Sequence, residues 1–476
     1  MLKKMYWLAA LVGVTLTACS SPPPTATSVL QDAQKAMGDQ KSVQISGTGM
    51  NAFFGQALVA GQEWPRRELT FTRSINFEQK SMRDELKFAQ PTFPSQQQDL
   101  QVNGGKAWNV GPQGPVPQPA AAEERQLSIW LTPHGFLKGA IAAGSGATLQ
   151  ARPEGSTEHV ITFKVLGKYE VKGTLDAQNM VTKVETMIGN PVLGDTPVVA
   201  SYSNYKDFSG VKVPTTVTVT EGGFPIWEMA ISNVTPNAAV DLPVPEAVQS
   251  ATVPPVKTES AKIADGVWFV SGGSHHSLVV EFKDYIAVVE GPLTEERSLA
   301  VLAEARKLVP KKPVKYVFST HHHFDHSGGL RTFVAEGATV VTHQSNVAFF
   351  EKTFAAPATI APDDQSSKAA KPMIEGVQGK FAITDGKQML EGYATGGDTH
   401  TKEYLLVYLR KPKILVEADA YNPGPPDAPV PQTPPPNAVA LYDSIQGLKL
   451  DVATIAPIHG RGPVPFAEFK KFIGKK

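Results

Sequence analysis

The 476-residue chain contains a single cysteine, Cys19, so it cannot form an internal disulfide. It also lacks an excess of charge of either sign, because 45 lysine and arginine residues balance 45 aspartate and glutamate residues. This balance argues against a dedicated nucleic-acid binder, whose positive surface neutralises the phosphate backbone. After the amino-terminal segment, no apolar run reaches the length of about 20 residues that a membrane-spanning helix needs. The 40 glycine and 39 proline residues predict many turns and argue against a coiled coil.

The amino-terminal segment explains the single cysteine. Residues 1–18 contain two early lysines and a short apolar run, which is typical of a signal peptide. Residues 16–19 (LTAC) resemble the bacterial lipobox, which implies cleavage before Cys19 and lipidation of that residue. Ser20 is similar to the default signal for outer-membrane sorting. We therefore expect an outer-membrane protein that faces the periplasm, with residues 19–27 as the tether to its lipid anchor.

The first half of the chain favours strands. Residues 28–37 have the spacing of a short amphipathic helix, whereas residues 168–185 and 210–221 alternate apolar and polar side chains with a period of two. Residues 28–245 are therefore predicted to form a mainly antiparallel β domain. Its order of elements faintly resembles the curved half-barrel of periplasmic lipoprotein carriers. Residues 243–255 contain four prolines and no apolar periodicity, so residues 246–257 are predicted to be a linker.

The second half, residues 258–476, alternates predicted strands and helices, which indicates an α/β domain. A helix is expected over residues 295–308, and a short buried strand over residues 314–319. Nine of the 11 histidines lie between His275 and His459. This concentration of one side chain indicates metal binding or acid–base chemistry.

A dense histidine motif directly follows the buried strand. The sequence HHHFDH at residues 321–326 contains the pattern H-x-H-x-D-H. Residues two apart on an extended segment point the same way, so His321 and His323 can bind one ion. Asp325 and His326, where the chain turns into a helix, can bind a second ion. His322 points away from its neighbours and is expected to face solvent or to support a ligand.

Three further ligand-type residues, His400, Asp419 and His459, each lie at the end of a predicted strand, where α/β proteins build sites. In this order, HHHFDH, GGDTHT, ILVEAD and APIHG resemble the metallo-β-lactamase-fold superfamily over residues 258–476. The resemblance implies an αββα sandwich with a dinuclear metal site at one edge. It also implies a first ion held by His321, His323 and His400, a second held by Asp325, His326 and His459, and a bridging carboxylate from Asp419.

The all-histidine and aspartate ligand set favours two zinc ions, although iron or manganese also suits these donors. The expected function is a zinc-dependent hydrolase in which a metal-bridging hydroxide cleaves a carbonyl ester, thioester, lactone or lactam bond. Asp325 would be the catalytic residue that orients the attacking oxygen. Two alternatives stay open: an iron-dependent redox enzyme of the same fold, and a lipid- or lipoprotein-binding protein with an accessory metal domain.

Several residues near the expected site have less certain roles. His275 and His276 lie on a glycine-rich loop and, with Tyr421, are candidates to line the substrate entrance. The proline-rich residues 423–436 are either a stiff wall of that entrance or a surface connector. Glu290 stands where many superfamily members have an aspartate, and we expect it to support the site in the same way. The sequence predicts a small-molecule substrate and leaves the oligomeric state open.

Overall fold

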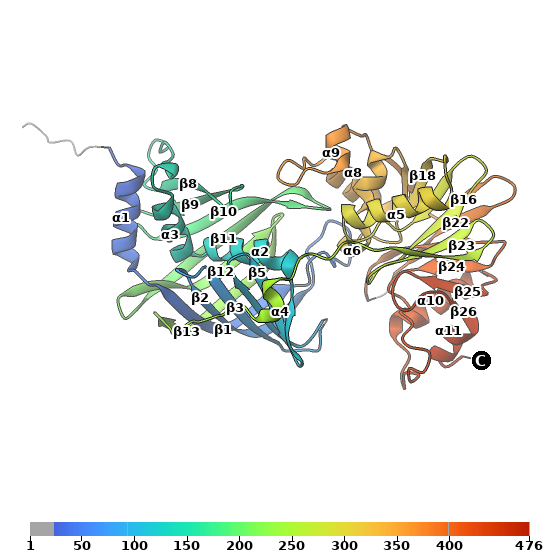
Figure 1. The fold of residues 1–476 in the computed structure, drawn as a ribbon, viewed down its shortest axis with the longest axis horizontal. Coiled ribbons are helices and arrows are strands. Elements are labelled where there is room, and N and C mark those ends of the chain that lie inside the picture. The colour runs from blue at the N-terminus through green and yellow to red at the C-terminus, as the bar shows by residue number, and fades with distance from the viewer. Residues whose placement is uncertain (1–22, 93, 398, 476) are drawn as a thin grey trace, which may run out of the picture.

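A computed structural model describes residues 23–92, 94–397 and 399–475. Cys19 and its expected lipidation therefore lie outside the described residues. Figure 1 shows two lobes, an amino-terminal lobe coloured blue to green and a carboxy-terminal lobe coloured yellow to red. Within the described part of the chain, no helix is long and apolar enough to cross a membrane.

The amino-terminal lobe is built on one sheet of 13 strands in the order β6-β5-β4-β3-β2-β1-β13-β12-β11-β10-β9-β8-β7. Every neighbouring pair in it is antiparallel, which confirms the predicted sheet. Its strands are β1 (Ser42–Ala52), β2 (Arg66–Asn76), β3 (Ser81–Phe88), β4 (Gln97–Asn103), β5 (Lys106–Gly111), β6 (Gly114–Pro117), β7 (Thr148–Leu149), β8 (His159–Val165), β9 (Tyr169–Leu175), β10 (Val181–Asn190), β11 (Gly194–Phe208), β12 (Val211–Glu221) and β13 (Phe224–Pro236).

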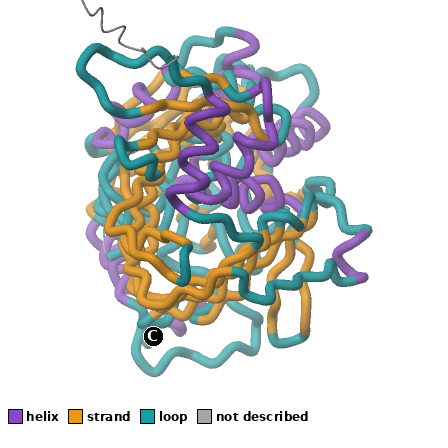
Figure 2. The backbone as a smooth tube through the Cα atoms, turned by 90° about the vertical axis from the view of Figure 1, so that its left-hand side faces the viewer, coloured by secondary structure: helices purple, strands orange, loops and turns teal. Residues whose placement is uncertain are grey.

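Side-chain alternation explains how this sheet buries one face. Along β11, Val198, Ala200 and Tyr202 are buried, whereas the residues between them are more exposed. The buried side chains join one core cluster with Phe136 and Leu137 of a helix packed on the sheet. In the end view of Figure 2, strands curve around the helices.

Helices line the inner side of this sheet. They are α1 (Ala26–Met37), α2 (Ala122–Trp130), α3 (Pro133–Ala143) and the short 3-10 turns η1 (Pro119–Ala121) and η2 (Gly144–Gly146). The sequence pattern predicts α1 but not α2 and α3. Most of α3 is buried, so it lacks the polar face that reveals a helix by periodicity. A side chain at Gly139 would place its Cβ 2.7 Å from the Phe163 ring, so a glycine is needed where α3 meets the sheet.

The predicted linker, residues 246–257, is not extended throughout. It begins with the helical turn α4 (Glu246–Gln249), in which Val248 is buried. This turn contacts β5 and β6 of the amino-terminal sheet. The start of the linker is therefore packed against the first lobe.

The carboxy-terminal lobe contains two sheets. The first has seven strands, β14 (Glu259–Ala264), β15 (Val267–Ser271), β16 (Ser277–Glu281), β17 (Ile286–Val289), β18 (Val314–Phe318), β19 (Thr339–His343) and β20 (Met373–Val377). The second has six strands, β21 (Lys380–Thr384), β22 (Met389–Gly396), β23 (Glu403–Leu409), β24 (Ile414–Glu417), β25 (Thr454–Pro457) and β26 (Val464–Pro465). The strands β17 to β20 run parallel, as do β24 and β25, so their carboxyl ends meet at one edge.

Helices cover the outer faces of both sheets (Figure 1). The helices of this lobe are α5 (Glu295–Leu308), α7 (Leu330–Ala335), η3 (Gln344–Asn346), α8 (Val347–Ala355), α9 (Asp364–Lys368), α10 (Pro436–Gly447), α11 (Phe466–Phe472) and, at the edge of the sandwich, α6 (Phe324–Ser327). One apolar cluster lies between the sheets and includes Val280 and Val289 of the first and Leu405 and Val416 of the second. Two further clusters join each sheet to its own helices. This order of layers confirms the predicted αββα sandwich.

Candidate metal centre

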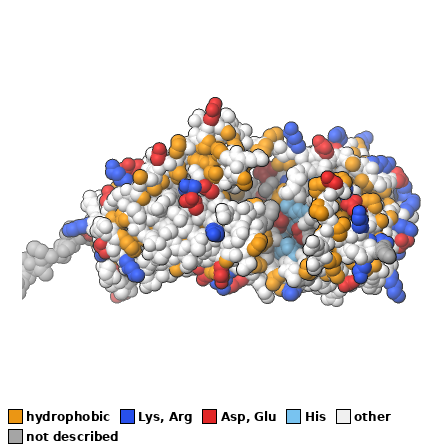
Figure 3. Space-filling model, turned by 90° about the horizontal axis from the view of Figure 1, so that it is seen from below, with side chains coloured by type: hydrophobic (Ala, Val, Ile, Leu, Met, Phe, Trp, Pro, Cys, Tyr) orange, Lys and Arg blue, Asp and Glu red, His pale blue; other side chains and the backbone are white. Residues whose placement is uncertain are grey.

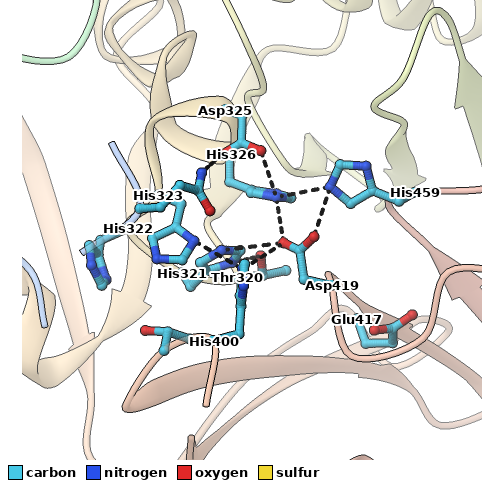
Figure 4. A network of polar contacts seen from close by, with 12 residues as sticks. Thr320, His321, His322, His323, Asp325, His326, His400, Glu417, Asp419 and His459 are labelled. Atoms are coloured by element: carbon cyan, nitrogen blue, oxygen red, sulfur yellow. Dashed lines mark hydrogen bonds and ion pairs between the residues drawn. The ribbon is translucent and has the colours of Figure 1, made fainter. Parts of the chain in front are cut away.

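Seven predicted ligand residues converge at the edge of the sandwich where strands end (Figure 4). His321 and His323 lie on the extended segment after β18, and Asp325 and His326 lie on α6. The remaining three follow or precede other strands: His400 comes before β23, Asp419 after β24, and His459 after β25. Residues up to 138 positions apart in the chain thus meet because parallel strands end at one edge.

The ligand atoms form three overlapping groups, and within each group all atoms lie within 4.8 Å of one another. The groups are His321, His323 and His400; His321, His326 and Asp419; and His275, Asp325, His326 and His459. The first group has the composition expected for the first ion. The third contains the three residues expected for the second ion and adds His275.

The Asp419 carboxylate lies between these groups. Its Oδ2 atom is 2.8 Å from His326 Nε2, 3.3 Å from His400 Nε2 and 3.4 Å from His321 Nε2, and its Oδ1 atom is 3.2 Å from His459 Nε2. Asp419 has a φ of 62°, a left-handed conformation that is uncommon for a residue with a side chain. Such conformations concentrate at functional sites, where the surrounding structure holds them.

The outward ring nitrogens of three histidines contact oxygen acceptors. The pairs are His323 Nε2 with the Ala57 carbonyl at 2.9 Å, His326 Nδ1 with Glu290 Oε2 at 2.7 Å, and His459 Nδ1 with the Ser274 carbonyl at 3.0 Å. A carbonyl or carboxylate oxygen only accepts, so each outward nitrogen carries the proton. The inward nitrogen of a ring that carries only this one proton presents a lone pair to the centre.

These lone pairs are what a divalent cation requires. His323 Nδ1 lies 3.0 Å from His400 Nε2, and His326 Nε2 lies 3.1 Å from His459 Nε2, so ring nitrogens face one another. Among the described residues, the buried His321 Nε2 atom has no hydrogen-bond partner. Nitrogen and carboxylate donors in this arrangement suit zinc, and the residues present fit the metal that their pattern predicts.

The charge states also suit metal binding. Burial lowers the pKa of His321 well below its ordinary value and that of His323 to about 3, so both rings are neutral at neutral pH. Burial raises the pKa of Asp419, but the neighbouring His326 and hydrogen bonds from the surrounding histidines hold that pKa well below its ordinary value. The bridging position is therefore occupied by a carboxylate.

Glu290 lies where the expected supporting role would place it. It follows β17, is fully buried, and has a φ of 71°. One carboxylate oxygen accepts from the Thr320 amide at 2.6 Å, while the other contacts His326. The Thr320 hydroxyl in turn lies 3.1 Å from His321 Nδ1. Glu290 thus connects the ends of two strands to two ligand rings.

His275 lies among the ligand atoms themselves, although the sequence placed it only at the substrate entrance. Its Nε2 atom is 3.2 Å from Asp325 Oδ2, and its Nδ1 atom is 2.8 Å from the Ser274 hydroxyl. The buried Arg297 side chain donates to the His275 carbonyl at 3.0 Å, which fixes this part of the loop. The position of His275 on a glycine-rich loop, far from the main motif, gave no metal-ligand spacing to detect.

Two predicted substrate contacts are wrong. Tyr421 is buried, and its ring packs 4.9 Å from the rings of both Phe469 and Phe472, so it belongs to the core beneath α11. His276 is also buried, and its Nε2 atom contacts the Gly460 carbonyl at 2.8 Å. It therefore holds the loop that carries His459 and does not line an entrance.

A loop of the amino-terminal lobe, residues 53–65 between β1 and β2, also reaches the centre. Gln56 Nε2 donates to Asp325 Oδ1 at 2.8 Å. His322 is buried rather than facing solvent, and its Nε2 atom contacts the Ala57 carbonyl at 2.9 Å. Sequence reasoning missed this loop, because a glutamine and a backbone carbonyl carry no motif.

The centre is accessible from the space between the lobes. Figure 3 shows histidine side chains in a hollow there, with acidic side chains beside them. The side chains of Asp325, His400 and His459 keep 32%, 23% and 16% of their surface exposed, whereas His321 is fully buried. A small molecule can therefore reach one side of the cluster.

Comparisons with known proteins agree with this site. Residues 270–459 match the model of the Metallo-beta-lactamase superfamily. Residues 270–459 form a domain of that superfamily. The match and the histidine–aspartate cluster together indicate a metallo-hydrolase domain. The matched segment ends at His459, the last predicted ligand in the chain.

The chain is similar to individual known proteins over only part of its length. The chain is 37% identical over 76 residues to a linear primary-alkylsulfatase from Pseudomonas sp, and this stretch is 16% of the chain and 11% of that protein. A metallo-beta-lactamase from Pontibacter korlensis is 20% identical with a TM-score of 0.35, and the match covers 46% of this chain and 98% of that one. A metallo-beta-lactamase from Hirschia baltica is 17% identical with a TM-score of 0.34, over 46% and 96% of the two chains.

Proposed function

We propose that the protein is a hydrolase that depends on two zinc ions. The observation that carries this proposal is the arrangement of the ring nitrogens: three outward nitrogens contact oxygen acceptors, and four other ring nitrogens lie within 3.4 Å of the Asp419 carboxylate. The first ion would be held by His321, His323 and His400 and the second by Asp325, His326 and His459, with Asp419 between them.

Bound divalent ions would polarise the bond to be cleaved and lower the pKa of water to about 7. The chain's own contribution is orientation. Asp325 has one carboxylate oxygen held by Gln56 and the other near His275, so its direction is fixed. From its partly exposed position it can orient a water molecule toward a substrate in the hollow. Asp325 is therefore the proposed catalytic residue.

The proposed substrates are small molecules with a carbonyl ester, thioester, lactone or lactam bond. The partial similarity to an alkylsulfatase supports adding sulfate esters to the same test. Purified full-length protein should be assayed against a panel of these compounds, first after chelation and then after addition of zinc. Hydrolysis that is lost on chelation and restored by zinc supports the proposal, and chelator-resistant hydrolysis contradicts it.

The alternative of an iron-dependent redox enzyme rests on the same donors, because imidazole and carboxylate also bind iron. Elemental analysis of protein purified without added metal distinguishes the two. Stoichiometric iron together with oxygen consumption would favour the redox enzyme, and stoichiometric zinc the hydrolase.

A second candidate function is the binding of an apolar ligand by the amino-terminal lobe. The concave side of its sheet encloses a cavity of about 580 Å³, lined mainly by apolar side chains such as Ile45, Leu127 and Met229. The buried Arg73 in the lining is paired with Asp84 at 2.6 Å, so it adds no unpaired charge. This size and lining suit an acyl chain.

Mass spectrometry of lipid extracted from the purified protein tests this second function. A matched experiment uses Ala200→Phe, which puts a ring into the cavity from the buried face of β11. The variant should lose binding of a fluorescent fatty acid and keep its metal content. Unchanged fatty-acid binding would leave the cavity as a structural feature only.

We also propose that the protein is anchored to the outer membrane through Cys19 and faces the periplasm. The LTAC sequence before and at this residue supports the proposal. Cys19→Ala should release the protein into the soluble fraction. The membrane fractions of the variant and of wild type are compared at equal expression levels. Continued sedimentation with membranes would contradict lipidation at Cys19.

A further inference from the structure

The loop at residues 53–65, here called the bridging loop, connects two adjacent strands of the first lobe yet binds the second lobe. The Gly55 carbonyl accepts from the Phe324 amide at 3.2 Å. The Leu58 carbonyl accepts from the Lys402 amide at 2.9 Å. Phe324 lies inside the HHHFDH motif, and Lys402 lies two residues after His400. The bridging loop therefore joins the two segments that supply the first group of ligands.

Between these two backbone contacts, the loop contacts the ligands directly. Gln56 donates to Asp325 Oδ1 at 2.8 Å, and the Ala57 carbonyl accepts from His323 Nε2 at 2.9 Å. The second contact fixes the tautomer of His323, because a proton on Nε2 leaves the lone pair on Nδ1. That Nδ1 atom lies 3.0 Å from His400 Nε2, on the metal-facing side.

The loop fits too closely to be an incidental neighbour. Gly55 has a φ of 76°, and a Cβ there would lie 2.8 Å from the Cβ of Phe324. The Phe324 ring packs edge-on against Phe54 at 5.4 Å and against Trp64 at 5.9 Å. The aromatic contacts fix the root of the loop, and the glycine lets its backbone approach the motif.

We propose that residues 55–58 of the amino-terminal lobe are a positioning element for the metal centre, with Gln56 as a positioning residue for Asp325. The proposal rests on the proposed metal-dependent function. Partners that orient a metal ligand contribute about 10- to 100-fold to metal affinity. The first lobe thus completes a site whose ligands all belong to the second.

Zinc affinity of the full-length protein, measured by competition with a chromophoric chelator, tests the proposal. Gln56→Met keeps the side-chain volume and removes the donor, so zinc affinity should fall by about tenfold. Gln62→Met is the matched control, because Gln62 is exposed in the same loop. The melting temperature of the metal-free protein should be equal in both variants, which a merely packing role for Gln56 would not give.

Gly55→Ala tests the backbone part of the element. It should weaken zinc binding more than Gly61→Ala, because both glycines have a φ of 76° but a Cβ at Gly61 would lie 3.5 Å from its nearest neighbour. Wild-type zinc affinity in both Gln56→Met and Gly55→Ala would overturn the inference while leaving the proposed function intact. A loss in Gly55→Ala alone would assign positioning to the backbone and overturn the role of Gln56. A wild-type protein that binds no divalent metal would overturn the proposed function as well.

Discussion

The two lobes contribute to the candidate metal centre through different kinds of groups. Among the described residues, the carboxy-terminal lobe supplies the imidazole and carboxylate atoms of the centre, whereas the amino-terminal lobe supplies the Ala57 carbonyl and the Gln56 amide. The first kind is visible in a sequence as a motif, and the second kind is not. The comparison teaches that an inspection of motifs finds the ligands of such a centre and misses part of what orients them.

The difference also predicts an order of effects. A ligand contacts the cation, so its loss removes a direct interaction and leaves the other donors without their common partner. A supporting group acts through a ligand, so its loss costs less. The size of the loss in metal binding, compared between variants of the two lobes, therefore tests whether ligands and supporting groups differ in this way.

The largest effect is expected from Asp419→Ala. This carboxylate lies within 3.4 Å of four imidazole nitrogens, so its loss should reduce metal occupancy and hydrolysis by more than the factor of about 100 that a supporting group can account for. Elemental analysis and the hydrolysis panel measure both. Full two-metal occupancy in this variant would show that the bridging carboxylate is elsewhere.

Glu417→Gln is the matched control for Asp419→Ala. Burial raises the pKa of Glu417 to about 8, so this neighbouring carboxyl is protonated at neutral pH and glutamine resembles it in charge and shape. Zinc content should therefore stay at the wild-type level. A loss equal to that of Asp419→Ala would indicate general damage to the loop after β24.

A smaller effect is expected from Glu290→Gln in the carboxy-terminal lobe. The variant removes the charge that faces His326 Nδ1, so zinc affinity should fall by about tenfold, similar to Gln56→Met in the other lobe. Glu304→Gln is the control. Glu304 lies on α5 and is also buried, but its carboxylate accepts from the Ser260 hydroxyl at 2.6 Å instead of contacting a ligand. An effect of Glu290→Gln as large as that of Asp419→Ala would break the distinction between ligands and supporting groups.

The sequence predicted the parts of the site whose chemistry is local. His321, His323, Asp325 and His326 lie within six residues, and their order alone indicates a metal. Glu290 was expected from its place in the family pattern, and its contact with His326 agrees with the expected role.

Other features depended on packing that no local pattern records. Tyr421 follows Asp419 by two residues, but its side chain turns into the core under α11 instead of toward the hollow. The helix α3 is buried on most sides, so its periodicity is lost. Ala57 is 266 residues from His323, and the contact uses only its backbone. The orientation of Tyr421, the burial of α3 and the contact between Ala57 and His323 all depend on tertiary contacts, so local sequence patterns do not predict them.

The variant with the smallest expected effect on the metal centre lies in the amino-terminal lobe. Burial raises the pKa of Glu221, beside the cavity, from 4.5 to about 7. Between these two values the folded protein keeps a proton that the unfolded chain has lost, so the free energy of unfolding should fall as the pH rises from about 4.5 to 7. Glu221→Gln cannot lose this proton and should be more stable than wild type at pH 8 by up to about 3 kcal/mol.

Denaturant unfolding at pH 5 and pH 8, with chelator present in all samples, measures this difference. Wild type and Glu221→Gln should have similar stability at the lower pH and separate at the higher one. An identical change with pH in both proteins would show that Glu221 titrates normally. The zinc affinity of the variant should stay unchanged, because Asn190, the polar partner of the Glu221 side chain, lies outside the bridging loop.

Elemental analysis paired with hydrolysis is the most direct test of the central claim that this chain is a metal-dependent hydrolase. Full-length protein should bind two zinc ions, lose hydrolysis of at least one panel substrate when they are removed, and regain it when zinc is restored. A chain that binds no divalent metal, or that hydrolyses the same substrate equally well after complete removal of metal, would contradict the claim.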